Sequence, residues 1–123
     1  MKNNIAPPAL LRHDAKREVW IEEGIYVYEL LNHPAHPQSS LARCRLPAFH
    51  ITRNHQLTVD ETYIIESGVG EMQVGGEIFD VKAGDSIHIP KGTSQNIENK
   101  SNDDLIFLAL CIPAFTPNCY TAI

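Results

Sequence analysis

From Glu18 onward, short β-branched and aromatic runs alternate with turn residues, a pattern that predicts β-strands. The first two runs, over 19–21 and 25–30, are separated by the sequence Glu22-Glu23-Gly24, where we expect a turn. Further short strands are predicted over 42–48, 50–55, 61–66, 70–74, 77–81, 85–89, 95–98 and 104–111. No segment has the apolar periodicity that would predict a helix.

Glycines and prolines mark the connections between these strands. The adjacent glycines Gly75 and Gly76 tolerate positive φ angles, so we expect a tight two-residue hairpin there. Residues 33–37, with the sequence HPAHP, are predicted to form a loop, because each proline lacks an amide donor and restricts the residue before it. Residues 1–17 have little periodicity, and we interpret them as an N-terminal arm that covers one end of the fold or reaches a partner.

The fold class follows from the number of strands and the length of the chain. The chain has 123 residues, which is the size of one domain. Since no low-complexity linker divides the sequence, residues 18–123 are expected to form a single domain after the arm. Many short strands without helices predict a sandwich or a closed barrel, in which edge strands are hidden or removed. Of these, we favour an all-β double-sheet jelly roll.

Charge and cysteine content narrow the possible partners. Ten Lys and Arg against fifteen Asp and Glu give a net charge of −5, which argues against nucleic acid and anionic membranes and favours a small-molecule ligand. The longest apolar stretch, 105–113, is shorter than the roughly 20 residues of a membrane helix. Without an export signal the protein is expected in the cytoplasm. Cys44, Cys111 and Cys119 have no CxxC spacing, so we expect reduced, packed thiols.

Two spaced patterns carry a resemblance to a known family. Residues 55–68 read HQL-x3-E-x6-G, and residues 84–99 read G-x5-PKG-x2-Q-x3-N. They resemble the first and second conserved motifs of the cupins. Three positions depart from those motifs: Leu57 replaces the second histidine of the first motif, Gln95 replaces the histidine of the second, and Phe49 stands where the leading glycine would be.

The resemblance covers roughly residues 40–115 and is strongest to a bacterial branch of small single-domain cupins with glutamine in the second motif. It implies a double-stranded β-helix, the jelly-roll barrel of cupins, that binds a polar small molecule. Cupins include isomerases, cyclases, lyases, oxygenases and binding proteins, so the resemblance alone selects no activity. We expect a divalent-metal-dependent enzyme of one of these types. The alternative is a non-catalytic binding or sensing cupin with a degenerate metal site.

The matched motif positions supply the candidate site. The resemblance implies His55, Glu61 and Gln95 as metal ligands. Because a carboxamide is a neutral, hard ligand, Mn or Fe is favoured over Zn or Ni, and a site without metal stays open. In that case His55 and Glu61 would act as a general acid and base pair. Tyr63 lies two residues beyond Glu61 on the same strand face and either donates a hydrogen bond to the ligand or packs in the core.

Several other side chains have structural interpretations. We expect His88 to point outward and His50 to lie on a strand with its ring away from the pocket. The amide of Asn99 is expected to tie a loop to its strand. Alternation alone does not decide whether Cys111 faces the pocket.

The last predicted strand suggests an oligomer. Both faces of residues 106–112 are apolar, so the strand is covered twice, and a homodimer is the simplest outer cover. Trp20, Tyr26 and Tyr28 offer a second contact surface, unless residues 5–11 of the arm cover them.

Overall fold

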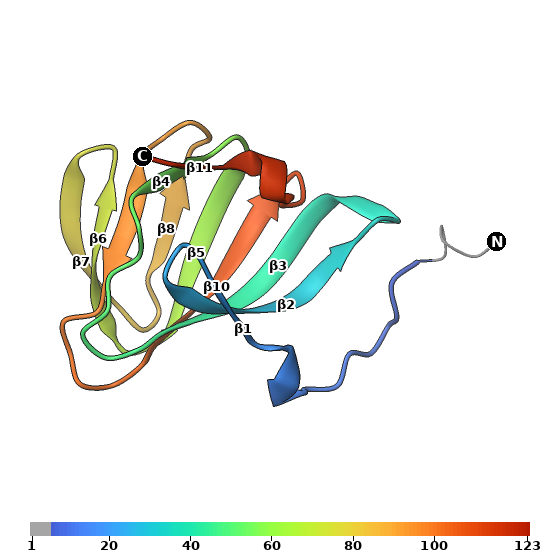
Figure 1. The fold of residues 1–123 in the computed structure, drawn as a ribbon, viewed down its shortest axis with the longest axis horizontal. Coiled ribbons are helices and arrows are strands. Elements are labelled where there is room, and N and C mark those ends of the chain that lie inside the picture. Colours follow the sequence, from blue (N-terminus) through green and yellow to red (C-terminus); the bar gives the residue numbers. More distant parts are fainter. Residues whose placement is uncertain (1–5) are drawn as a thin grey trace.

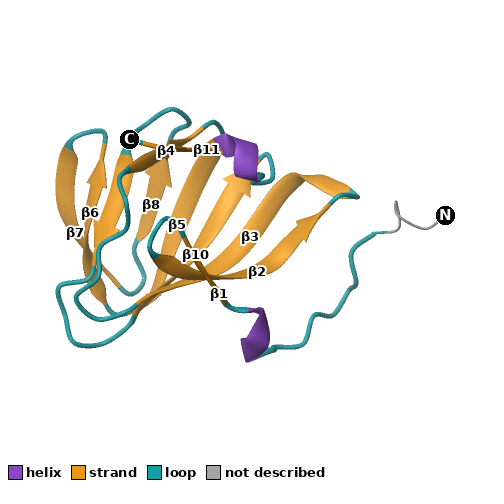
Figure 2. Ribbon diagram, viewed as in Figure 1, coloured by secondary structure: helices purple, strands orange, loops and turns teal. Residues whose placement is uncertain are grey.

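Two antiparallel sheets make up most of the molecule (Figures 1 and 2). The computed structural model describes residues 6–123. Within these residues the first sheet joins, in order of hydrogen bonding, β1 (Val19–Ile21), β2 (Ile25–His33), β3 (His36–Leu46), β10 (Leu105–Ile112), β5 (Asp60–Ser67) and β8 (Ser86–Ile89). The second joins β11 (Tyr120–Ala122), β4 (His55–Leu57), β9 (Gln95–Glu98), β6 (Val69–Val74) and β7 (Glu77–Lys82).

The core lies between the sheets and follows the alternation of the strands. In β10 the residues Leu105, Phe107, Ala109 and Cys111 are buried, while the residues between them are more exposed. Side chains from both sheets meet in one apolar cluster that includes Leu46, Ile65, Met72, Ile97 and Phe107. The predicted all-β jelly roll is confirmed by this arrangement.

Three local predictions, about a turn, a strand face and a loop, are also confirmed. Gly75 and Gly76 have φ angles of 57° and 92° and join β6 to β7 by a two-residue turn. His88 is exposed between the buried Ile87 and Ile89. The side-chain amide of Asn99 donates to the carbonyl oxygens of residues 46, 47 and 103, which ties the loop as expected.

The predicted loop over residues 33–37 is wrong. It is a tight hairpin in which β2 reaches His33 and β3 begins at His36, and these two residues are paired. Pro34 occupies the turn, where its fixed φ suits a change of direction. Pro37 precedes Ser40, the first β3 residue paired with β10, so its missing amide interrupts no hydrogen bond with that strand.

The strand predicted over residues 50–55 is also wrong. Residues 50–54 belong to no strand, Ile51 makes an isolated bridge to Glu98, and β4 starts at His55. His50 therefore does not lie on a strand. The sequence pattern missed β11, which pairs with β4. Both strands have three residues, too few for alternation to stand out from their surroundings.

The arm is described from residue 6, and residues 1–5 of the predicted segment lie outside the described residues. It runs away from the sheets beyond a 3-10 turn, η1 (Ala15–Arg17) (Figure 1). The end of the arm covers Tyr28. The Tyr28 hydroxyl accepts a hydrogen bond of 2.8 Å from the Asp14 amide, and the His13 ring stacks on the Tyr28 ring. Trp20 remains 49% exposed. In the described residues no helix has the length and apolar character to cross a membrane.

Candidate functional site

A cavity of about 300 Å³ opens on the inner side of the first sheet. Its walls come from β1, β2, β3, β5 and β10, together with the turn after β1 and the segment that follows β10. This volume lies at the lower end of the range for small-molecule pockets, roughly 300–1,000 Å³. Most of the lining is apolar, and its polar side chains include Glu23, Glu29, Asn32, Glu61 and Tyr63.

Glu61 reaches this cavity from the start of β5. Alternation buries Glu61 with Tyr63 and Ile65, as the sequence predicted, and Glu61 is 7% exposed. Its Oε1 accepts a hydrogen bond of 2.8 Å from the amide nitrogen of Gln95. Burial raises the pKa of Glu61 to about 7, although hydrogen bonds from Gln95 and Cys111 act in the opposite direction. The carboxyl group therefore exchanges a proton near neutral pH.

The side of the sheet that Cys111 faces, left open by the sequence, is the cavity side. Cys111 pairs with Glu61 in the register of β10 and β5, and its thiol donates to Glu61 Oε2 at 3.7 Å. A thiol is a weak donor. Burial, followed by the nearby carboxylate of Glu61, raises the pKa of Cys111, so the thiol keeps its proton.

Gln95 and Tyr63 form a hydrogen-bonded chain that ends on Glu61. The Tyr63 hydroxyl donates to Gln95 Oε1 at 3.0 Å, and Gln95 in turn donates to Glu61. Gln95 is 1% exposed and Tyr63 is 3% exposed, and the Tyr63 ring packs on Phe107. Both the oxygen and the nitrogen of the Gln95 side-chain amide are thus hydrogen-bonded within the protein. The chain fixes the direction of the Glu61 carboxyl group.

His55 lies beside Gln95 through the pairing of β4 and β9 but faces a different acid. Its Nδ1 is 2.7 Å from the carbonyl oxygen of Arg53. A carbonyl only accepts, so Nδ1 carries the proton and Nε2 has the free lone pair. That lone pair faces Glu23 Oε1 at 3.5 Å. Burial lowers the pKa of His55, which keeps the ring neutral.

Glu23 is the site residue that the sequence did not reveal. It lies in the turn between β1 and β2, where we expected only a connection, and its side chain is 14% exposed. The turn is anchored by the Arg53 amide, which donates to the Glu23 carbonyl oxygen at 2.7 Å. Burial and, to a smaller extent, the charge of Glu61 raise the pKa of Glu23 to about 8. An acid in a turn has no pattern that separates it from surface residues, so no sequence signal marked it.

The arrangement does not fit the metal that the cupin resemblance implies. The three predicted ligands are neighbours, but the Gln95 oxygen accepts from Tyr63 and the Gln95 nitrogen faces Glu61. His55 directs its free nitrogen to Glu23 instead of Glu61. Across residues 6–123, no group of three or more His, Cys, Asp or Glu side chains is placed to share an ion. The donors present are better suited to exchanging protons.

Comparisons with known proteins agree with the motifs. Residues 47–112 match the family model described as a cupin domain. An uncharacterized protein of Methanocaldococcus jannaschii is 35% identical over 98 residues, which cover 77% of this chain and 78% of the relative. The chain belongs to the cupin family. The predicted resemblance is thereby confirmed.

Solved structures show that this cupin shares its fold with enzymes. A predicted oxalate decarboxylase from Thermotoga maritima is 34% identical, with a TM-score of 0.68 over 72% of this chain and 80% of that one. A nucleoside dehydratase from Streptomyces is 16% identical, with a TM-score of 0.75 over 94% of this chain and 92% of that one. At that identity the second likeness concerns the fold alone.

Proposed function

We propose that this cupin binds a small molecule in the cavity and transfers a proton to or from it, as an isomerase or a lyase does. The observation that carries the proposal is the pair of carboxyl groups, Glu23 and Glu61, which separate elements hold on the wall of one mostly apolar cavity. Carboxyl groups in such surroundings exchange protons near neutral pH and act as general acids and bases.

The two carboxyl groups have complementary protonation states. With a pKa of about 7, Glu61 is substantially ionised near neutral pH and can accept a proton from the ligand. With a pKa of about 8, Glu23 is mostly protonated and can donate one. An acid and a base that face the same ligand can shift a double bond or expel a leaving group.

The surrounding residues position these two groups. Gln95 holds Glu61 Oε1, so Oε2 is the oxygen that reaches the ligand. The Tyr63 hydroxyl donates a hydrogen bond to Gln95. We therefore assign Tyr63 a positioning role in place of the ligand contact considered from the sequence. His55 stands behind Glu23, with the free nitrogen of its neutral ring 3.5 Å from Glu23 Oε1.

The name of the Thermotoga maritima protein raises oxalate as a ligand, and the cavity disfavours such a dianion. Glu23, Glu29 and Glu61 all contribute to the lining, whereas no Lys or Arg is among the lining residues in the described chain. An anion without a positive partner is costly to bury in apolar surroundings. We therefore place dicarboxylates outside the ligand class of this cupin.

A non-catalytic cupin that binds or senses a ligand is the second candidate. The hydrogen-bonded chain from Tyr63 through Gln95 to Glu61 favours it, because the same bonds connect β5 and β9 whether or not a reaction occurs. In that case Glu61→Gln keeps ligand affinity, and the bound molecule is never converted.

Proton exchange in D2O separates the two candidates. The protein is incubated with a panel of small carbonyl compounds and amines in the presence of a chelator, and NMR follows loss of C–H signals and appearance of products. We expect exchange or conversion of at least one compound and a decrease of about 100-fold or more in Glu61→Gln. Glu77→Gln, an exposed acid on β7, is the matched control. Exchange that survives Glu61→Gln, or that the chelator stops, contradicts the proposal.

The homodimer expected from the sequence is part of the proposal as well. The outward face of β10 has half-buried Ile106, Leu108 and Leu110, and Ile112 is 55% exposed. A second copy packed on this face would cover it. A light-scattering mass of two chains, reduced to one by Leu108→Lys, would support this assembly, and a single-chain mass for the unmodified protein would refute it.

A further inference from the structure

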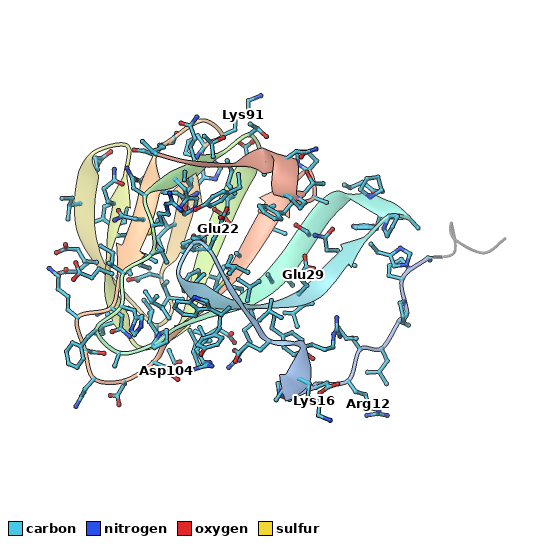
Figure 3. All side chains as sticks on the ribbon, in the orientation of Figure 1. Arg12, Lys16, Glu22, Glu29, Lys91 and Asp104 are labelled. Atoms are coloured by element: carbon cyan, nitrogen blue, oxygen red, sulfur yellow. The ribbon has the colours of Figure 1, made fainter. Side chains whose placement is uncertain are left out.

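The cavity is acidic both in its interior and at its exposed side. Glu23 and Glu61 lie in the interior, and the exposed Glu29 of β2 contributes a third carboxyl group. Among the described residues that line the cavity there is no Lys or Arg. In Figure 3 the labelled Arg12, Lys16 and Lys91 lie at the periphery of the molecule. Residues 6–123 therefore supply no positive partner inside the cavity.

Two of these carboxyl groups have an oxygen atom without a strong donor. Glu61 is more than nine-tenths buried, and its Oε2 has only the Cys111 thiol, at 3.7 Å, among the described residues. Glu23 has the His55 ring nitrogen at 3.5 Å, which is long for a hydrogen bond. Buried acceptors without donors cost free energy, so a ligand that brings N–H groups would satisfy both of them.

The apolar residues of the cavity wall indicate what the rest of the ligand is. Ile25, Val27, Ala109 and Phe115 line the same space as the carboxyl groups. A fully solvated polar molecule would leave these side chains without contacts, whereas an apolar body would remove their surface from water. The volume of about 300 Å³ limits that body to a small one.

We propose that the cavity takes a small organic cation, with a primary ammonium group directed at Glu61 and Glu23 and an apolar body against the remaining wall. This inference rests on the proposed function only in treating the cavity as the ligand site. Charge-assisted hydrogen bonds are about twice as strong as neutral ones, and the apolar surroundings strengthen them further. The ligand class is therefore set by charge as well as by shape.

Three probes of similar shape test the charge directly: cyclohexylammonium, cyclohexanol and cyclohexanecarboxylate. Each is titrated into the full chain at about pH 9 and one ionic strength, above the pKa of about 7 of Glu61 and of about 8 of Glu23, so that both acids are ionised. Binding is followed by calorimetry and by NMR shifts of cavity residues. We expect the ammonium compound to bind at least about tenfold more tightly than the alcohol, and the carboxylate to bind most weakly. Glu61→Gln and Glu23→Gln should each reduce this preference, and Glu77→Gln should preserve it.

The outcomes separate this inference from the proposed function. Equal or tighter binding of the alcohol or the carboxylate overturns the cation class, and the deuterium-exchange result then stands independently. Failure of the ammonium compound to bind at millimolar concentration overturns the class too. Glu23→Gln provides the same information if Glu61→Gln does not fold, since the two acids belong to different elements.

Discussion

Glu61 and Glu23 bring the same chemical group to one cavity from two different kinds of structure. Glu61 lies on β5, an interior strand between β10 and β8, and Gln95 fixes one of its oxygens at 2.8 Å. Glu23 lies in a turn beside β1, an edge strand, and its nearest side-chain partner is 3.5 Å away. Burial is similar, but only one of the two groups has a fixed direction. The rigid acid is suited to proton transfer, and the loosely held one can adjust to the ligand.

The difference in hydrogen bonding also accounts for the difference in pKa. Burial raises both values, and for Glu61 the bonds from Gln95 and Cys111 pull the pKa back to about 7. Glu23 receives no such bonds from the described residues, and the charge of Glu61 adds to burial, so the pKa of Glu23 reaches about 8. A carboxyl group without donors thus carries the larger free-energy cost of ionisation in the folded state.

The largest effect we expect is on the pH dependence of stability in Glu23→Gln. A folded pKa of about 8 against 4.5 when unfolded means that the unfolded chain loses its proton first as pH rises. The stabilising contribution of Glu23 to the unfolding free energy is fully present below pH 4.5 and is lost as pH rises through about 8. Above that pH, Glu23→Gln should be more stable than the unmodified protein by up to roughly 5 kcal/mol, since a pKa unit is worth about 1.4 kcal/mol.

Urea unfolding from acid to alkaline pH measures this difference, and Glu61→Gln sharpens the comparison. Its folded pKa of about 7 predicts a gain in stability with the same sign that is completed at lower pH and is smaller, up to roughly 3.5 kcal/mol. Equal gains in the two variants would refute the claim that hydrogen bonds distinguish the two acids. A loss of stability in Glu23→Gln at alkaline pH would refute the burial of that carboxyl group.

The next largest effect concerns the hydrogen bonds from Tyr63 through Gln95 that hold Glu61. Gln95→Leu leaves the Tyr63 hydroxyl and Glu61 Oε1 without partners in the core. Unsatisfied buried groups each cost about 1–3 kcal/mol, and with relaxation we expect a loss of about 2 kcal/mol in unfolding free energy. The pKa of Glu61 should rise further, toward that of Glu23, because its donor is gone.

A second substitution shows whether this loss comes from the hydroxyl. In the Gln95→Leu background, Tyr63→Phe removes the stranded group and should recover part of the stability. In the unmodified background Tyr63→Phe removes a bond instead and should destabilise. If both Tyr63→Phe changes have the same effect, Tyr63 and Gln95 are not coupled, and the direction of Glu61 has another origin.

Alternation along strands made the part of the site around Glu61 predictable. A strand places every second residue on one face, so Glu61 and Tyr63 were expected to point inward, and His88 was expected to point outward. The glycines at 75 and 76 and the amide of Asn99 were also predictable, because their roles depend on local backbone geometry.

The part of the site around Glu23 was not predictable, because it depends on which elements meet in space. Glu23 belongs to an ordinary turn until pairing of β1 with β2 carries that turn over the inner face of the sheet. β11 forms by pairing with β4, and β4 lies between β11 and β9. The motif placed Gln95 in the core beside Glu61, but its amide oxygen accepts from Tyr63, a residue 32 positions away.

The smallest expected effect lies in a motif position remote from both acids. Phe49 stands where the cupin motif has glycine, and it has a φ angle of 60°. A left-handed conformation costs a non-glycine residue roughly 1–2 kcal/mol, and the ring, 72% exposed, gains little from packing. Phe49→Gly should therefore raise the unfolding free energy by at most about 1 kcal/mol, since glycine also stabilises the unfolded chain. Urea unfolding measures the gain, and NMR titration should find the pKa values of Glu23 and Glu61 unchanged. A loss of stability would mean that the aromatic ring contributes more than the backbone strain costs.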